Sequence, residues 1–353
     1  MKRYDNIQIL RVLACLGVFV SHLAPKMGVT GTAASVANFG ASGVYLFFLV
    51  SAFLACAGAG RETSAEGRNG NRLLRYYLKR LLRILPLYYA VILYNFLLHT
   101  FILQDVPVDP AGLGWLRYLF LTNAFLPAPN NFWGNLTATW TISLFMVFYL
   151  CAPLLARIAG VTGRNDSQSG YSTECGILRA SLLYIGTVIL QQVWMELSCS
   201  AYMMCFYYLN FFTLGILVWQ LAGHKNRWMA AAVLAVECVG LGILLYVWKG
   251  EVPYFTGISW MYAFVVLITM GFSWERTEKI AGIRRIFAIL DRHSYAIYLV
   301  HAVIVEGMVL VTAHIPLKGM AVGLISVLLT IAGVWAAYLV IEKPIERLSR
   351  RIK

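Results

Sequence analysis

Apolar residues dominate this chain and recur in runs of about twenty from one terminus to the other. A run of that length crosses the hydrocarbon core of a bilayer as an α-helix, whereas a membrane β-barrel would show short alternating segments. The sequence therefore predicts an all-α polytopic membrane protein, a bundle of about ten transmembrane helices. The predicted spans are residues 7–24, 39–59, 80–103, 137–158, 178–198, 203–222, 228–248, 254–273, 293–312 and 319–341.

Three longer polar stretches interrupt these spans within what we expect to be a single membrane domain, residues 1–353. They are expected as a basic cytoplasmic loop at about 60–79, a long outer loop at about 104–136 and a flexible inner loop rich in Gly, Ser and Asn at about 159–177. The loop at 104–136 contains an apolar piece, residues 115–125, that is too short to span. This piece is predicted to lie at the interface or to re-enter the membrane, in a loop long enough to bind a ligand.

The composition agrees with a membrane protein, because 60% of the residues are hydrophobic, 13% are charged and the mean hydropathy is +0.70. The net charge of +13 does not require a nucleic-acid partner. Lys and Arg gather in alternate loops and at both termini, as the positive-inside rule predicts. We therefore expect a multi-pass protein of the cytoplasmic membrane with both termini in the cytoplasm. No spacing of Cys and His predicts a metal site.

The first predicted span carries two groups that hydrocarbon tolerates poorly, Arg11 and His22. They are eleven residues apart, which on an α-helix is a rotation of about 20° and a rise of roughly 16 Å. Both side chains should therefore project from one face, one near each end of the membrane. This pair is the axis of a candidate functional site. The alternative is that Arg11 snorkels to the headgroups and His22 lies in the outer interface.

Two further spans carry isolated polar groups. Arg80 and Arg83 lie one turn apart at the start of the third span, where two guanidinium groups would suit a phosphate ligand. The same arginines could instead serve only to orient the helix. Ser51 is a hydroxyl in the largely apolar second span, where serine usually bonds to its own backbone or to a neighbouring helix.

The ninth predicted span has a polar face. Ser294, Tyr298, His301 and Val305 follow helical spacing, and Glu306 comes next. His301 should lie near the middle of the membrane, where an ionisable residue is a candidate for function. Its alternative is a buried imidazole that hydrogen-bonds to Tyr298 or to another span.

Taken together, these motifs resemble the acyltransferase 3 family, and the resemblance runs in the right order from Arg11 to Pro344. No single motif is specific, but the combination covers nearly the whole chain. The matching segments are Arg11 with ten residues before His22, FFLVSAFL at 47–54, RLLR followed by ILP at 80–86, TWTISLFMVFYLCAP at 139–153, SYAIYLVH at 294–301 and IEKP at 341–344.

The resemblance implies transfer of an acyl group, commonly acetyl, from cytoplasmic acyl-CoA to a hydroxyl of a carbohydrate or related acceptor at the outer face. His22 matches the essential histidine of the family, Arg11 its partner on the same helix, and Arg80 and Arg83 the pair associated with the CoA donor. The implied partners are acyl-CoA, a glycan and membrane lipid, without a metal or nucleic acid, and association into a homo-oligomer is left open. Supporting roles near His22 fall to Ser51, Trp140, Tyr298, His301 and Glu306.

Two positions depart from the family pattern. Ala52 follows Ser51 where members often have glycine, and Phe145 stands where many have a glutamate. The second change removes one candidate acid or base and indicates a branch with a different acceptor site. The residues alone leave two other classes of protein open. One is a transporter of an anionic or acylated sugar or of a lipid-linked substrate, and the other is a membrane scaffold or receptor without catalytic activity.

Overall fold

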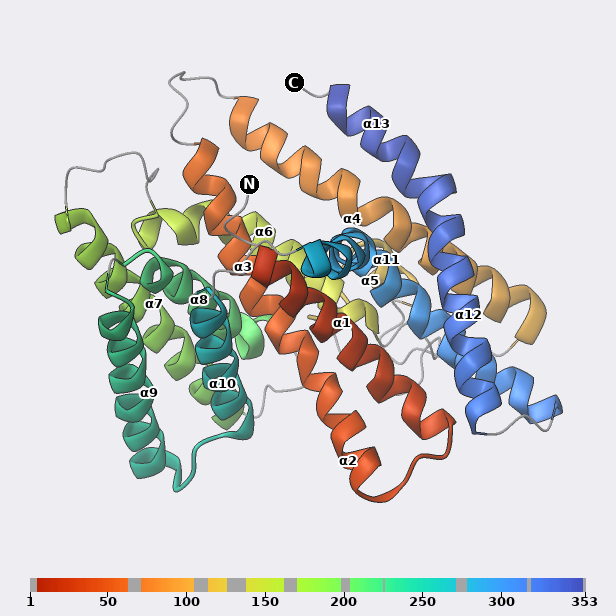
Figure 1. The fold of residues 1–353 in the computed structure, drawn as a ribbon, viewed down its shortest axis with the longest axis horizontal. Coiled ribbons are helices and arrows are strands. Elements are labelled where there is room, and N and C mark those ends of the chain that lie inside the picture. Colours follow the sequence, from red (N-terminus) through yellow and green to blue (C-terminus); the bar gives the residue numbers. More distant parts are fainter. Residues whose placement is uncertain are drawn as a thin grey trace. The chain divides into compact units, whose positions relative to one another are not determined.

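A computed structural model describes residues 5–62, 71–104, 114–125, 138–161, 170–197, 204–224, 226–270, 278–315 and 319–351 (Figure 1). These residues form helices, and no strand occurs among them. Eight of the described helical segments are long and apolar enough to cross a membrane, and two shorter apolar helices lie at residues 206–222 and 254–269. The ten predicted spans therefore all correspond to helices, and the protein is an all-α polytopic membrane protein.

The helices follow the chain in a simple order. The first part comprises α1 (Asp5–Lys26), α2 (Gly31–Phe39), α3 (Gly43–Glu62), α4 (Asn71–Leu97), the π-helical turn η2 (Leu98–Leu103), α5 (Leu116–Leu119) and α6 (Trp140–Ile158). The second part comprises α7 (Gly170–Glu196), α8 (Met204–Ala222), α9 (Arg227–Lys249), α10 (Tyr254–Thr269), α11 (Glu278–His314), α12 (Met320–Ala337), the π-helical turn η4 (Tyr338–Glu342) and α13 (Lys343–Arg351).

Several helices extend beyond the apolar runs that predicted them. α4 begins at Asn71 and α7 at Gly170, so part of the stretches expected as loops at 60–79 and 159–177 is helical. The remainder of these stretches, and most of the expected loop at 104–136, lies outside the described residues. Hydropathy identifies only the part of a helix that lies in hydrocarbon, and a helix that continues as a polar segment gives no such signal.

The chain divides into two compact units, which we describe in turn. Unit 1 comprises Met1–Arg11, Tyr45–Asn69 and Val147–Ala288, and unit 2 comprises Val12–Val44, Gly70–Met146 and Ile289–Lys353.

In unit 1, α7 to α10 stand side by side (Figure 1). The interior of this group is partly polar. Thr187 of α7 and Thr213 of α8 share a hydrogen bond of 2.7 Å, and Asn210 Nδ2 donates to Gln191 Oε1 at 3.0 Å. Such bonds join helices in a membrane, where association gains little from the hydrophobic effect. α8 is therefore anchored by specific contacts and buried along most of its length.

In unit 2, α12 continues through η4 into α13, and both η4 and α13 contact α4 (Figure 1). Elsewhere in the unit, α1 meets the turn before α3 at backbone distance. A Cβ atom on Gly40 would lie 2.2 Å from the carbonyl oxygen of Gly17, and one on Gly43 would lie 2.5 Å from that of Ala14. Only glycine allows this approach, so these residues fix where α1 crosses the start of α3.

Candidate active site

Two histidines from distant parts of the sequence form the centre of unit 2. His22 Nδ1 of α1 lies 3.0 Å from His301 Nε2 of α11, and the two rings stack with centroids 5.2 Å apart and planes 16° apart. His301 is fully buried, whereas His22 is exposed at the end of α1. The hydrogen bond therefore joins an accessible imidazole to a sequestered one.

The second nitrogen of His301 determines the tautomer of both rings. His301 Nδ1 lies 2.9 Å from the carbonyl oxygen of Ile297, which can only accept, so Nδ1 carries the proton. In a neutral His301, Nε2 is then the acceptor, and His22 Nδ1 must donate to it. A neutral His22 consequently has its lone pair on Nε2, and within the described part of the chain this nitrogen has no hydrogen-bond partner. This is the arrangement that a general base or a nucleophile needs.

Parallel packing of α1 against α11 brings the histidines together. Cys15 Sγ donates to the carbonyl oxygen of Ser294 at 3.4 Å, and His22 meets His301 seven residues further along both helices. Seven residues are two helical turns, so the same faces of the two helices stay in contact over this distance. The face predicted for α11 is buried throughout, with Ser294, Tyr298, His301 and Val305 all inside the unit.

Apolar side chains surround the His22–His301 pair on one side. The ring of Phe19 lies 5.5 Å from that of His301, and Phe19 packs with Leu23 and Val305 in a buried cluster. Half-buried Glu306 lies five residues after His301 on α11, and exposed Lys26 lies one turn after His22 on α1. The site thus combines apolar side chains with one acidic and one basic residue on the two helices that carry the imidazoles.

Tyr298 connects this pair to the start of α6. Its ring meets His301 edge to face at 5.7 Å, and its hydroxyl donates to the carbonyl oxygen of Ala138 at 3.3 Å. Thr141 Oγ1 lies 3.0 Å from the same hydroxyl. Trp140, the first residue of α6, is half-buried in the same segment. The sequence did not single out Thr141, although it lies inside the motif that carries the resemblance.

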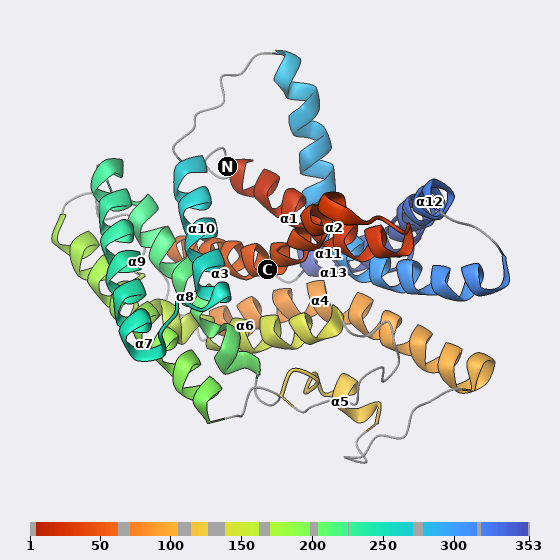
Figure 2. The same ribbon diagram turned by 90° about the horizontal axis from the view of Figure 1, so that it is seen from below.

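The apolar piece at residues 115–125 contains the short helix α5, which lies beside α4 (Figure 2). The hydroxyls of Tyr88 and Tyr89 donate to the carbonyl oxygens of Tyr118 and Leu119 at 2.8 and 2.9 Å. Both tyrosines lie within the apolar helical segment Leu73–Leu103. The segment at 114–125 is therefore bound to the side of α4, and its position at the interface or within the membrane stays a prediction.

Asn123, just after α5, joins the segment at 114–125 to α6. Its Nδ2 donates to Thr139 Oγ1 at 2.9 Å, and Ser143 Oγ donates to its Oδ1. The side chains of Thr139, Thr141 and Ser143 thus face two partners, the 114–125 segment and Tyr298. The start of α6 therefore connects the 114–125 segment to the residues around the histidines.

The arginine pair lies on α4 in the same unit. The guanidinium of Arg80 stands 5.6 Å from the centre of the Tyr76 ring, and Arg83 is exposed one turn later. Tyr295 of α11 donates its hydroxyl to the carbonyl oxygen of Ile84 at 2.7 Å. This bond fixes α11 to α4 immediately after Arg83, so one helix contacts both the arginine segment and, two turns later, His22.

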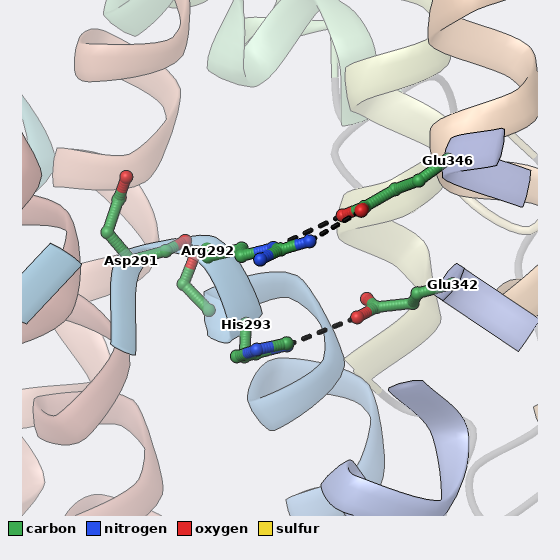
Figure 3. Close-up of polar contacts among 6 residues, drawn as sticks. Asp291, Arg292, His293, Glu342 and Glu346 are labelled. Carbon is green, nitrogen blue, oxygen red and sulfur yellow. Dashed lines mark hydrogen bonds and ion pairs between the residues drawn. The ribbon is translucent and has the colours of Figure 1, made fainter. Parts of the chain in front are cut away.

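An ion pair and a hydrogen bond join α11 to α13 and η4 close to this point (Figure 3). Arg292 binds both oxygens of Glu346, with 3.2 Å from Nε to Oε1, and His293 Nδ1 lies 3.2 Å from Glu342 Oε2. Tyr338 lies between them, with its ring 5.3 Å from the Arg292 guanidinium and 5.0 Å from the His293 ring. The IEKP motif therefore includes a carboxylate that anchors α11.

Two predicted site residues belong to unit 1. Arg11 and Ser51 are both half-buried there, on α1 and α3. The same unit contains an acid that sequence reasoning missed: Glu237, in the span of α9, accepts a hydrogen bond of 3.0 Å from Ser181 of α7. A single carboxyl in an apolar span is a signal that the rule applied to His301 would have found.

Comparison with known proteins agrees with the motifs. The family model described as an acyltransferase domain matches residues 4–339. A curated relative, "Acyltransferase MdmB" of Streptomyces mycarofaciens, is 29% identical over 166 residues, which cover 44% of this chain and 40% of the relative. The chain thus matches about two-fifths of the length of that relative. No solved structure matches the chain.

Proposed function

We propose that this chain, which belongs to the acyltransferase 3 family, is a membrane O-acyltransferase. The proposed reaction moves an acyl group, commonly acetyl, from acyl-CoA to a hydroxyl of a cell-surface glycan. The family supports the acyltransferase activity itself. The donor, the acyl group and the acceptor are our proposal.

The observation that carries this proposal is the contact of His22 with His301, from which we infer the tautomer of His22. With Nδ1–H donated to His301, Nε2 of His22 can remove the proton from the acceptor hydroxyl as its oxygen attacks the thioester carbonyl. A carbon–oxygen bond forms and the carbon–sulfur bond breaks. The proton on Nε2 then passes to the departing CoA thiolate, so His22 returns to its starting state and no proton is gained or lost.

The surroundings suit each charge that develops. While His22 holds the extra proton, its bond to His301 becomes charge-assisted. We assign Glu306, five residues after His301 on the same helix, the role of offsetting the positive charge. Arg80 and Arg83 would bind the phosphates of CoA at the cytoplasmic surface. We assign Tyr298 the role of holding the His301 ring, and we keep Arg11, Ser51 and Trp140 as supporting residues whose roles rest on the resemblance.

The experiment compares wild-type protein with His22→Ala in detergent, using radiolabelled acetyl-CoA and a panel of carbohydrate acceptors. Wild type should release CoA and label an acceptor, and the variant should do neither while it still inserts and purifies as a folded protein. Full transfer by His22→Ala would refute the assignment of the base. Movement of an acceptor across a membrane without consumption of the thioester would instead support a transporter.

A further inference from the structure

Two basic helical segments meet in unit 2, where α13 packs against α4 (Figure 1). α4 contributes Arg80 and Arg83, and α13 contributes Lys343 and Arg347, which also lie one turn apart. Positive charge on two adjoining helices attracts anions to this part of the unit. The question is whether nearby acids already neutralise α13.

The two acids nearest in sequence to these cations, Glu342 and Glu346, bind residues of α11 (Figure 3). Glu342 binds His293 and Glu346 binds Arg292, so both carboxylates face α11. Lys343 follows the first acid by one residue and Arg347 follows the second, which on a helix turns each about 100° away from its neighbour. Within the described part of the chain, Lys343 and Arg347 form no ion pair.

These cations lie in the same part of unit 2 as the arginine pair. Tyr295 of α11 donates its hydroxyl to Ile84, the residue after Arg83, and His293, two residues before Tyr295, lies 3.2 Å from Glu342. Lys343 directly follows Glu342. α11 therefore contacts both the segment of α4 that carries the arginines and the start of the segment that carries Lys343 and Arg347, and η4 and α13 also contact α4.

We propose that Lys343 and Arg347 bind the 3′-phosphate of acyl-CoA, while Arg80 and Arg83 bind its pyrophosphate; this inference rests on the proposed function. Two guanidinium groups one turn apart suit the adjoining phosphates of a pyrophosphate, since each can donate two parallel hydrogen bonds. The 3′-phosphate is a separate dianion on the ribose and needs cations of its own. The α13 pair provides them, and the acids beside it are held away by α11.

The test measures affinity for CoA and for dephospho-CoA, which lacks the 3′-phosphate, using protein in nanodiscs of phosphatidylcholine. Wild type should bind CoA at least about tenfold more tightly than dephospho-CoA, because charged hydrogen bonds to that phosphate are lost. The double variant Lys343→Gln/Arg347→Gln should bind the two ligands equally. Arg80→Gln/Arg83→Gln should weaken both ligands and keep the preference for CoA.

Lys249→Gln is the matched control, since it removes a cation that pairs with Glu196 in unit 1, and it should leave both affinities unchanged. Lys343→Arg/Arg347→Lys keeps the charge and should restore the preference. A continued preference for CoA in Lys343→Gln/Arg347→Gln would overturn this inference and leave the proposed function intact. If that variant loses binding to anionic lipid vesicles but keeps the preference for CoA, Lys343 and Arg347 bind a lipid headgroup instead. Failure of wild type to bind CoA would remove both proposals.

Discussion

His301 should control the rate of acyl transfer without touching either substrate. Replacement by leucine removes the nitrogen that accepts from His22 Nδ1, whereas glutamine offers an amide oxygen that can still accept. We therefore expect His301→Leu to lower kcat and His301→Gln to recover part of the loss. Binding of the donor should change little in either variant.

The magnitude follows from the bond that is lost. When His22 takes up the proton of the acceptor hydroxyl, its bond to His301 becomes charge-assisted, and such a bond contributes about 1.5–3 kcal/mol. If that contribution is present only in the transition state, its loss lowers kcat roughly 10- to 150-fold. Removal of the base itself by His22→Ala should cost more, about 10²- to 10⁴-fold.

The assay is CoA release at saturating donor and acceptor, with the His22 and His301 variants measured side by side. Unfolding temperatures of the purified variants distinguish a loss of folded protein from a loss of the hydrogen bond that orients His22. Wild-type kcat in His301→Leu would refute the reasoning. Equal loss in the leucine and glutamine variants would show that the ring, and not its acceptor nitrogen, matters.

Two further predictions concern the packing that supports the site. Gly43→Ala should lower stability by about 1–3 kcal/mol, because its Cβ would lie 2.5 Å from the carbonyl oxygen of Ala14 and backbone must move, whereas Gly240→Ala meets nothing within 4 Å. Thermal unfolding in detergent compares the two, and equal melting temperatures would contradict the close approach. Ser181→Ala should be destabilising by about 1–3 kcal/mol in wild type and near neutral in a Glu237→Leu background, since the bond between them is then already absent. Additive effects in this double-mutant cycle would show that the bond contributes nothing.

The sequence was sufficient for the architecture, because each span is a continuous apolar run and the bilayer sets its length. It was less informative about helix ends. α4 and α7 begin in polar segments, at Asn71 and Gly170, where hydropathy has no signal. Residues 115–125 are not among the helices long enough to span, as predicted, but their packing beside Tyr88 and Tyr89 depends on two hydroxyl–carbonyl bonds that no local pattern encodes.

The candidate site was predictable as a set of residues but not as an arrangement. His22 and His301 stood out because ionisable side chains in hydrocarbon are costly. The resemblance implied a supporting role near His22 for His301 and four other residues, and the alternative for His301 was a bond to Tyr298 or to another span. Its partner is His22, and the pairing depends on the parallel register of α1 and α11, in which Cys15 meets Ser294 two turns earlier. The tautomer depends in addition on the carbonyl of Ile297, a backbone group that residue types do not reveal.

The continuity of α11 has a mechanical consequence. One uninterrupted helix holds Tyr295 against α4 and His301 against His22. An axial slip by the rise of a single residue, about 1.5 Å, would lengthen and misalign the imidazole contact of 3.0 Å and so weaken that hydrogen bond. Any ligand that tightens or loosens the junction of α4 and α11 would therefore be sensed at the imidazoles, so an empty site and a loaded one would differ in the strength of their base.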